Sequence, residues 1–307
     1  MRVRTVRRTG DGPVAKLRSA AAGLAGLGRE GGIVHLMWPT LPAMDALRLA
    51  TLRVPTVLTV HNHVPHRRDR LRELGLARLY RSADRLVFAS EYTAARFVET
   101  FGGAFGAPRA VVPHGLLEPA GGGAPGAWPR TLEPSVVFAG LVRRYKGVET
   151  LIEAAPALAA DGLGVEIHGR WDAGLERDRA FVAREGGAFR RVDRFLDDEE
   201  FAALMRRDAL FVMPYRAATQ SGVLYTLLGA RRAFVASRAG DTARTLEAAG
   251  LGELLFEPGD ARSLVEAVRR ARAGLGALTE RLEALRESRR WERLLDAAAV
   301  ERIYGPD

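Results

Sequence analysis

Short runs of apolar residues alternate with helical patterns along almost the whole chain, and this alternation limits the fold more than any other feature of the sequence. Eight such runs are predicted to be strands: Ile33–Met37, Thr56–Val60, Arg85–Ala89, Ala110–Val112, Ser135–Ala139, Val165–His168, Leu210–Met213 and Phe234–Ala236. They are apolar throughout rather than at every second position, which is typical of parallel strands covered by helices on both faces. Between them lie amphipathic segments such as Val148–Leu158. The sequence therefore predicts an α/β fold with doubly wound parallel sheets.

Glycine and proline are concentrated between Glu118 and Pro134, a stretch without helical or strand periodicity. Such a stretch is typical of a linker, and a chain of 307 residues is long enough for two domains. We therefore expect an N-terminal Rossmann-like domain over residues 1–118, a linker over 119–134 and a second Rossmann-like domain over 135–289.

The chain contains no cysteine, which excludes disulfides, thiolate metal ligands and thiol nucleophiles. No stretch approaches the roughly 20 apolar residues that span a bilayer. The arginine-rich start, with a mildly apolar stretch from Ala20 to Leu27, lacks the strong apolar segment of a signal peptide. These features predict a cytoplasmic protein.

The formal net charge is +9, and only Lys16 and Lys146 are lysines, so 46 − 2 = 44 of the basic residues are arginines. This bias weakens any argument from charge to partner. The charge still fits phosphate-bearing substrates or peripheral contact with an anionic membrane on the cytoplasmic face. A nucleic-acid-binding protein is the remote alternative, and we expect no nucleic-acid partner because basic patches interleaved with stacking aromatics are missing.

The segment VFAGLVRRYKGVETLIEAAPAL, residues 137–158, places three cations between a strand and a helix. The strand ends at Gly140, the loop carries Arg143, Arg144 and Lys146, and the helix begins near Gly147. A compact ammonium suits a phosphate where a broad guanidinium does not fit. Taken alone, three basic residues fit a solvated surface loop better than a ligand site.

A second segment, residues 191–223, ends in Thr219-Gln220-Ser221-Gly222-Val223 at the start of a predicted helix. Ser221 is suited to cap this helix, and Gly222 allows a phosphate to approach the free N–H groups at its positive end. A merely well-capped helix is the alternative. After Pro214-Tyr215-Arg216, and with the first loop present, the ligand site is favoured.

These two segments resemble the glycosyltransferase family 4 (group 1) signature, in a branch with Gly-Leu-Val-Arg-x-Tyr-Lys-Gly and Pro-Tyr-Arg-x-Ala-Thr-Gln-Ser-Gly-Val motifs. The resemblance extends from about Ile33 to Tyr304. It implies a GT-B fold, in which two Rossmann-like domains face a cleft. It also implies a retaining hexosyltransferase that moves a sugar from a nucleotide-diphosphate sugar to an acceptor hydroxyl. UDP is favoured as the donor nucleotide over GDP or dTDP, and no cofactor or metal is expected.

The resemblance assigns roles to individual residues. Arg143 and Lys146 would hold the donor diphosphate, and His61, in the loop TVHNHVPHRRD, would face the sugar. His63 and His66 would lie on the acceptor side, although these histidines could also be ordinary loop residues. A metal site formed by the three is not expected, because no cysteine or well-placed carboxylate completes it. The remaining donor-binding residues are Gly140, Arg194, Phe195, Tyr215, Thr219, Gln220, Ser221, Gly222, Val223 and Leu224.

The resemblance also reaches the ends of the domains. His114-Gly115 resembles the turn that leads into the crossover, and Trp291-Glu292-Arg293 resembles the family's closing segment. In the family a terminal helix, here 290–307, returns to complete the first domain. Closure across the linker would exclude water from the donor. The acceptor would be a saccharide, a lipid-linked saccharide or a small metabolite.

The sequence departs from the family at two places. Relatives carry two glutamates eight positions apart, and these positions correspond here to Thr219 and Leu227. The following stretch, Arg231-Arg232-Ala233-Phe234, also departs from the family's Gly-x-Pro-Val pattern. A catalytically degenerate homologue that binds a nucleotide or a protein partner is therefore an alternative, and a nucleotide-sugar epimerase of the same fold is another.

Overall fold

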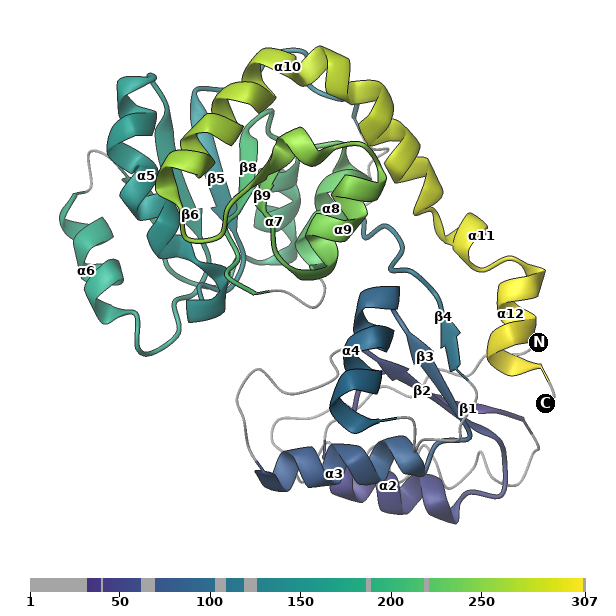
Figure 1. The fold of residues 1–307 in the computed structure, drawn as a ribbon. Coiled ribbons are helices and arrows are strands. Elements are labelled where there is room, and N and C mark those ends of the chain that lie inside the picture. Colours follow the sequence, from purple (N-terminus) through teal and green to yellow (C-terminus); the bar gives the residue numbers. More distant parts are fainter. Residues whose placement is uncertain are drawn as a thin grey trace. The chain divides into compact units, whose positions relative to one another are not determined.

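The computed structural model describes residues 32–39, 41–61, 70–102, 109–118, 126–185, 189–217 and 221–305. The chain forms two compact units (Figure 1). Unit 1 contains the chain up to Val112 together with the C-terminal segment from Leu295, and unit 2 extends from Pro113 to Leu294. Each unit is built on its own parallel sheet, so the expected α/β class is confirmed.

Unit 1 contains a parallel four-stranded sheet in the order β1-β2-β3-β4. Its strands are β1 (Val34–Leu36), β2 (Thr56–Val60), β3 (Arg85–Phe88) and β4 (Arg109–Val111). Helices α2 (Pro42–Thr51), α3 (Arg70–Arg81) and α4 (Glu91–Phe101) connect them. Leu58, Leu86 and Phe88 are buried together with apolar residues of these helices, so all three helices cover one face of the sheet. Helices α2 and α3 lie side by side on this face (Figure 1).

The opposite face of this sheet is covered by the last helix of the chain, α12 (Ala297–Tyr304). Ile303 is buried there against Val57, Val87 and Ala110, which alternate along their strands with the residues of the other face. Asp296 caps the helix by accepting a hydrogen bond from the Ala299 N–H at 2.7 Å. The C-terminal segment therefore packs on a sheet formed by the first third of the chain.

Unit 2 contains a parallel six-stranded sheet in the order β10-β9-β8-β5-β6-β7. Its strands are β5 (Ser135–Ala139), β6 (Gly164–His168), β7 (Phe189–Val192), β8 (Leu210–Met213), β9 (Phe234–Ser237) and β10 (Leu255–Phe256). The chain fills the sheet outward from β5 in one direction and then returns to β8 to fill the other. The strand order therefore reverses between β5 and β8, and open α/β sheets bind ligands at such a point.

Helices cover both faces of this second sheet (Figure 1). They are α5 (Val148–Ala160), α6 (Glu176–Arg184), α7 (Asp198–Met205), α8 (Gly222–Ala230), α9 (Gly240–Ala248) and α10 (Ala261–Ser288), with short 3-10 helices η2 (Arg144–Lys146) and η3 (Gly252–Leu254) and a final turn α11 (Trp291–Leu294). Helix α10 packs against α5 and α8. Strands β5, β8 and β9 are buried at every position, as central parallel strands should be.

All eight expected strands are present, with ends shifted by a residue or so, whereas the sequence did not predict β7 and β10. Both lie at the edges of the sheet. Strand β7 (FRRV) exposes its two arginines, and β10 is apolar but only two residues long, so neither forms an apolar run of the expected kind and length. Residues 119–125 of the expected linker lie outside the described residues. The chain passes from one unit to the other after Val112 and again after Leu294. The domain boundaries expected from the sequence stay predictions.

Candidate functional site

The loops that follow β5 and β8 meet at the point where the strand order of unit 2 reverses. The Arg216 N–H donates to the Tyr145 carbonyl at 2.8 Å, which joins the two loops directly. Gly147 has a φ of 62°, and a Cβ there would lie 1.9 Å from the Pro214 carbonyl oxygen. Only glycine allows the two loops to pack this closely. The segment that carries Arg143 and Lys146 is thus fixed against the segment that carries Tyr215.

Lys146 points back over this junction and is partly buried there. Its Nζ lies 3.4 Å from the Tyr215 hydroxyl and 5.0 Å from the centre of the Tyr215 ring. A Cβ on Gly140 would lie 3.1 Å from the same Nζ, so the glycine at the end of β5 leaves room for the ammonium. Burial lowers the pKa of Lys146, and the charge of Arg143 lowers it further while Tyr145 raises it. Among the described residues no carboxylate is paired with this ammonium, and a partly buried ammonium of this kind is suited to bind an anion.

Arg143 lies beside Lys146 and forms an ion pair with Asp172. The Arg143 Nε is 3.2 Å from Asp172 Oδ2, but no aligned hydrogen bond is formed by this Nε. The loop after β6 is held to the loop after β5 because the Asp172 N–H donates to the Val142 carbonyl at 2.9 Å. The neighbouring Arg144 is exposed and donates to the Gly174 carbonyl at 3.2 Å. A loosely aligned carboxylate can be exchanged for a phosphate on Arg143.

Helix α8 begins at the same sheet edge, and Ser221 caps it as expected from the sequence. The Ser221 hydroxyl accepts a hydrogen bond from the Leu224 N–H at 3.4 Å. Gly222 and Val223 occupy the first turn, whose N–H groups have no partners within the helix. Tyr215 is fully buried close to Ser221, and burial raises its pKa to about 12, so its hydroxyl stays protonated. Thr219 and Gln220 lie outside the described residues.

Phe195 and Arg194 follow β7 at the same edge of the sheet. The Phe195 ring is more than half exposed, and the guanidinium carbon of Arg170 lies 4.1 Å from its centre. Arg194 is engaged by Glu200, which accepts from its Nη1 at 2.6 Å and holds its Nη2 as well. This pairing lowers the pKa of Glu200 to about 2. The Arg194 side chain is therefore held by a carboxylate, and Phe195 presents an aromatic face.

His61 belongs to unit 1, where it follows β2. Its ring stacks on Trp38, with 3.8 Å between ring centres and 3° between planes. Trp38 follows β1 and is largely exposed, so the two rings form an aromatic surface at the carboxyl end of the first sheet. His63 and His66 lie outside the described residues. The roles expected of these three histidines stay predictions.

Two positions that depart from the family pattern have structural roles. Leu227 is completely buried in the core of unit 2 and cannot reach a ligand. Arg232 is also buried, and its guanidinium donates to the Asp208 carboxylate and to the carbonyls of Ala230 and Ala127. Arg231 ends α8 with a φ of 55° and pairs with Glu283. Both arginines therefore bond to other groups of unit 2.

Sequence reasoning missed Asp172 and Arg170, which contact Arg143 and Phe195. Both follow β6 by only a few residues. Because the carboxyl ends of parallel strands gather at one edge, the position of these residues after a predicted strand was a usable signal. Their partners could not be identified from the sequence, because the pairs join loops that follow different strands.

Comparison with known sequences identifies the family to which this chain belongs. The chain belongs to the group 1, or family 4, glycosyltransferases. A family described as "Glycosyl transferases group 1" matches residues 133–273, and "Glycosyltransferase Family 4" matches residues 24–116. The resemblance inferred from the motifs at 137–158 and 191–223 is thereby confirmed at the level of the family. No curated protein matches the sequence.

Solved structures with the GT-B fold are similar to this chain over nearly its whole length. Sucrose-phosphate synthase from Thermosynechococcus elongatus is 21% identical, with a TM-score of 0.65 over 92% of this chain and 75% of the other. A UDP-forming trehalose-phosphate synthase from Burkholderia xenovorans, solved with glucose-6-phosphate, is 15% identical, with a TM-score of 0.67 over 94% and 79%. The Anabaena protein Alr3699/HepE, solved with UDP, is 16% identical, with a TM-score of 0.64 over 95% and 80%. The expected GT-B fold is confirmed.

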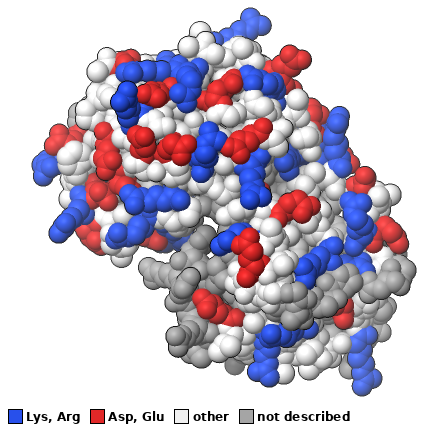
Figure 2. Space-filling model, in the orientation of Figure 1, with Lys and Arg blue, Asp and Glu red and all other residues white. Residues whose placement is uncertain are grey.

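Three further observations concern membrane-spanning helices, metal ligands and the distribution of charge. No helix in the described ranges is long and apolar enough to cross a membrane. Within the same ranges, no cluster of three or more histidine and acidic side chains is arranged to hold a metal ion. Arginines and acidic residues alternate over the face of unit 2 in Figure 2. Many arginines of unit 2 are paired with carboxylates, as Arg281 is with Glu253. The face in Figure 2 therefore shows mixed charge and no single basic stripe.

Proposed function

We propose that this chain is a retaining glycosyltransferase that moves a sugar from UDP-sugar to an acceptor hydroxyl, with the diphosphate held in unit 2. The observation that carries the proposal is the placement of Lys146, whose ammonium is drawn into a partly buried position where the strand order reverses. Arg143 lies next to it in the same loop. In the first turn of α8 Ser221 caps the Leu224 N–H, and the Gly222 and Val223 N–H groups point out of the positive end of the helix. Lys146, Arg143 and the start of α8 therefore all contribute positive potential that would attract the diphosphate.

The chemistry of the transfer requires this positive charge. The bond between the anomeric carbon and the diphosphate oxygen breaks, the acceptor oxygen bonds to the same carbon, and the acceptor releases its proton. Negative charge grows on the departing diphosphate, and Lys146 and Arg143 stabilise it. Because protein cations do this, the reaction needs no divalent metal. Phe195 would lie against the base, and His61 would hydrogen-bond to a sugar.

The similar structures favour UDP as the donor nucleotide, since one of them was solved with UDP and another is described as UDP-forming. GDP and dTDP remain the alternatives. A sugar phosphate is a reasonable first acceptor because one similar structure holds glucose-6-phosphate. Saccharides, lipid-linked saccharides and other small metabolites are the further acceptors to test.

The experiment measures nucleotide release from UDP-, GDP- and dTDP-glucose, each with glucose-6-phosphate, a disaccharide or no acceptor. We expect acceptor-dependent release of UDP that EDTA does not abolish, and a product whose anomeric configuration is that of the donor. Release that depends on added Mg²⁺, or a product with inverted configuration, would contradict the corresponding part of the proposal.

A catalytically degenerate homologue is the second candidate, and one specific observation favours it. Leu227 occupies the position of a family glutamate and is buried in the core, so no carboxylate is available there. This candidate predicts UDP binding without nucleotide release from any donor. The release assay and a UDP-binding measurement together separate the two candidates.

A further inference from the structure

Helix α2 of unit 1 has its apolar and polar faces in an unusual arrangement. Its single acidic residue, Asp45, faces inward and accepts a hydrogen bond from the Leu41 N–H at 3.1 Å. Met44 and Leu47 face outward, and 69% of Leu47 is exposed. A helix on the surface of a protein ordinarily presents polar residues to water. The outward face of α2 is therefore built to meet something other than bulk water.

The neighbouring helix α3 extends this apolar surface. The two helices pack closely, since a Cβ on Gly75 of α3 would lie 3.1 Å from the Ala43 nitrogen of α2. Leu74 of α3 is 68% exposed, which is close to the value for Leu47. We call the exposed residues Leu41, Met44, Leu47 and Leu74 the α2–α3 patch.

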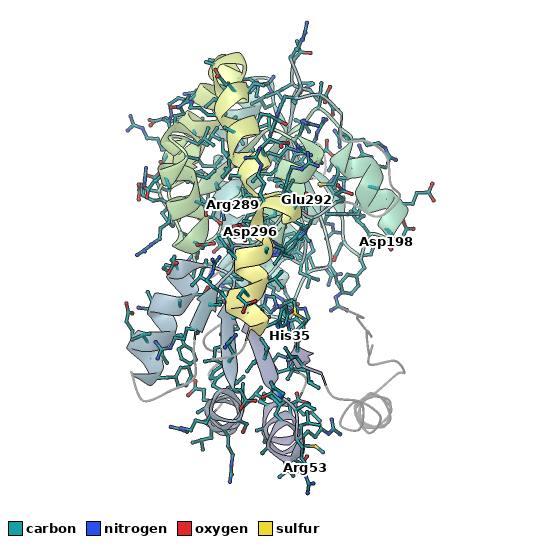
Figure 3. The ribbon with its side chains drawn as sticks, turned by 90° about the vertical axis from the view of Figure 1, so that its right-hand side faces the viewer. His35, Arg53, Asp198, Arg289, Glu292 and Asp296 are labelled. Carbon is teal, nitrogen blue, oxygen red and sulfur yellow. The ribbon has the colours of Figure 1, made fainter. Side chains whose placement is uncertain are left out.

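The exposed charged side chains described in the segments 41–55 and 70–82 are arginines. Exposed arginines follow or end these helices: Arg53, Arg78 and Arg81. Arg53 lies beside the two helices, which Figure 3 shows end-on. The only acidic residues in the segments 41–55 and 70–82 are the buried Asp45 and the partly buried Glu73. An apolar centre with a basic rim complements a surface that is apolar beneath a layer of negative charge.

We propose that the α2–α3 patch binds the surface of an anionic lipid membrane. The leucines and Met44 enter the boundary between headgroups and acyl chains, and the arginines contact lipid phosphates. The patch contains no aromatic residue, whereas protein–protein interfaces are enriched in Tyr, Trp and Phe, so a bilayer fits it better than a protein partner. This inference does not depend on the sugar-transfer reaction, because it concerns a different surface and is read out by binding alone.

The test is co-sedimentation of the full chain with vesicles of phosphatidylcholine, with and without about one third phosphatidylglycerol. We expect binding to the anionic vesicles and little binding to phosphatidylcholine alone. The double variant Leu47→Gln/Leu74→Gln should bind at least about tenfold more weakly, and Arg53→Gln about fivefold more weakly. Both leucines are exposed, so the variants should keep the melting temperature of the wild type.

The matched control is Phe181→Gln/Arg184→Gln, which removes an exposed apolar residue and an arginine from α6 of unit 2. It should bind vesicles as the wild type does. The proposal is overturned if the wild type does not bind anionic vesicles, or if the control loses as much binding as the patch variant. It is also overturned if light scattering shows a dimer that Leu47→Gln/Leu74→Gln dissociates, because the patch would then be covered by a second copy of the chain.

Discussion

The ammonium of Lys146 lies 3.4 Å from the hydroxyl of Tyr215, and each residue comes from a loop on one side of the point where the strand order of unit 2 reverses. Tyr215 is fully buried and keeps its proton, so it holds the lysine by its hydroxyl and ring without neutralising it. The positive charge therefore stays available for a ligand.

Replacing Lys146 with alanine should lower acceptor-dependent UDP release by about 100- to 1,000-fold, because charge on the leaving diphosphate loses its nearest cation. Arg144 is the matched control, since it lies in the same loop but is exposed and bonded to a carbonyl. Arg144→Ala should change turnover by less than about threefold. Similar losses in both variants would indicate a general effect of loop charge, and near-normal turnover of Lys146→Ala would remove it from the site.

The affinity for UDP should fall at alkaline pH, below the ordinary lysine pKa of 10.5, because burial lowers the pKa of Lys146. Protonated Lys146 binds the diphosphate, and the attraction is lost as the pH rises through the lowered pKa. Calorimetric titration with UDP between about pH 7 and 10 measures this loss. In Lys146→Arg the guanidinium stays charged over this range. The remaining affinity of this variant for UDP should therefore not change with pH. An equal alkaline loss in both proteins would assign the titration to another group.

Asp172→Asn should raise the affinity for UDP by about two- to fivefold. In the free protein Asp172 forms an ion pair with Arg143, and the ligand must displace this carboxylate. The asparagine keeps the shape of the side chain, and the backbone bond of residue 172 to Val142 is unaffected. Weaker binding of UDP by Asp172→Asn would mean that the carboxylate instead holds Arg143 in its binding position.

Unit 1 should lose stability in mild acid because of His35. Its ring bonds to the Tyr304 hydroxyl and the Thr59 hydroxyl, both at 2.7 Å, and it lies beside α12 (Figure 3). Burial lowers its pKa from 6.5 to about 4, so the unfolded chain takes up a proton first. The contribution of His35 to the free energy of unfolding is complete above about pH 6.5. Roughly 3 kcal/mol of it is lost as the pH falls towards 4.

Urea unfolding of the wild type and of His35→Gln at several pH values tests this prediction. The difference in unfolding free energy between the two proteins should shrink or reverse from pH 7 to pH 4, because glutamine keeps hydrogen bonds but does not titrate. A difference that is constant with pH would show that His35 does not take part in the acid loss.

The central strands and the cap of α8 could be predicted from sequence because their signals are local. Buried parallel strands are apolar throughout, and Ser221 before Gly222 is a local capping signal, which the structure bears out. The pairing of Arg143 with Asp172 could not be predicted, because it joins loops after different strands. The edge strands were missed for a related reason, since the exposed Arg190 and Arg191 interrupt the apolar run in β7.

The family pattern does not predict what Arg232 does in the structure. The stretch 231–234 departs from the family's pattern, yet the buried guanidinium of Arg232 ties the end of α8 to surrounding carbonyls and to Asp208. Such a role depends on contacts far along the chain, so it is visible only in three dimensions.

The most direct test of the central claim is the thermal unfolding of the wild type and of Lys146→Ala with UDP, GDP, dTDP and ADP, each in large excess. A ligand at 100 times its dissociation constant adds about 2.7 kcal/mol, which should raise the melting temperature by about 5 °C or more. We expect this shift for UDP with the wild type, and at most a small fraction of it with Lys146→Ala. No shift with any nucleotide, or an equal shift of both proteins by UDP, would contradict a diphosphate site built on Lys146.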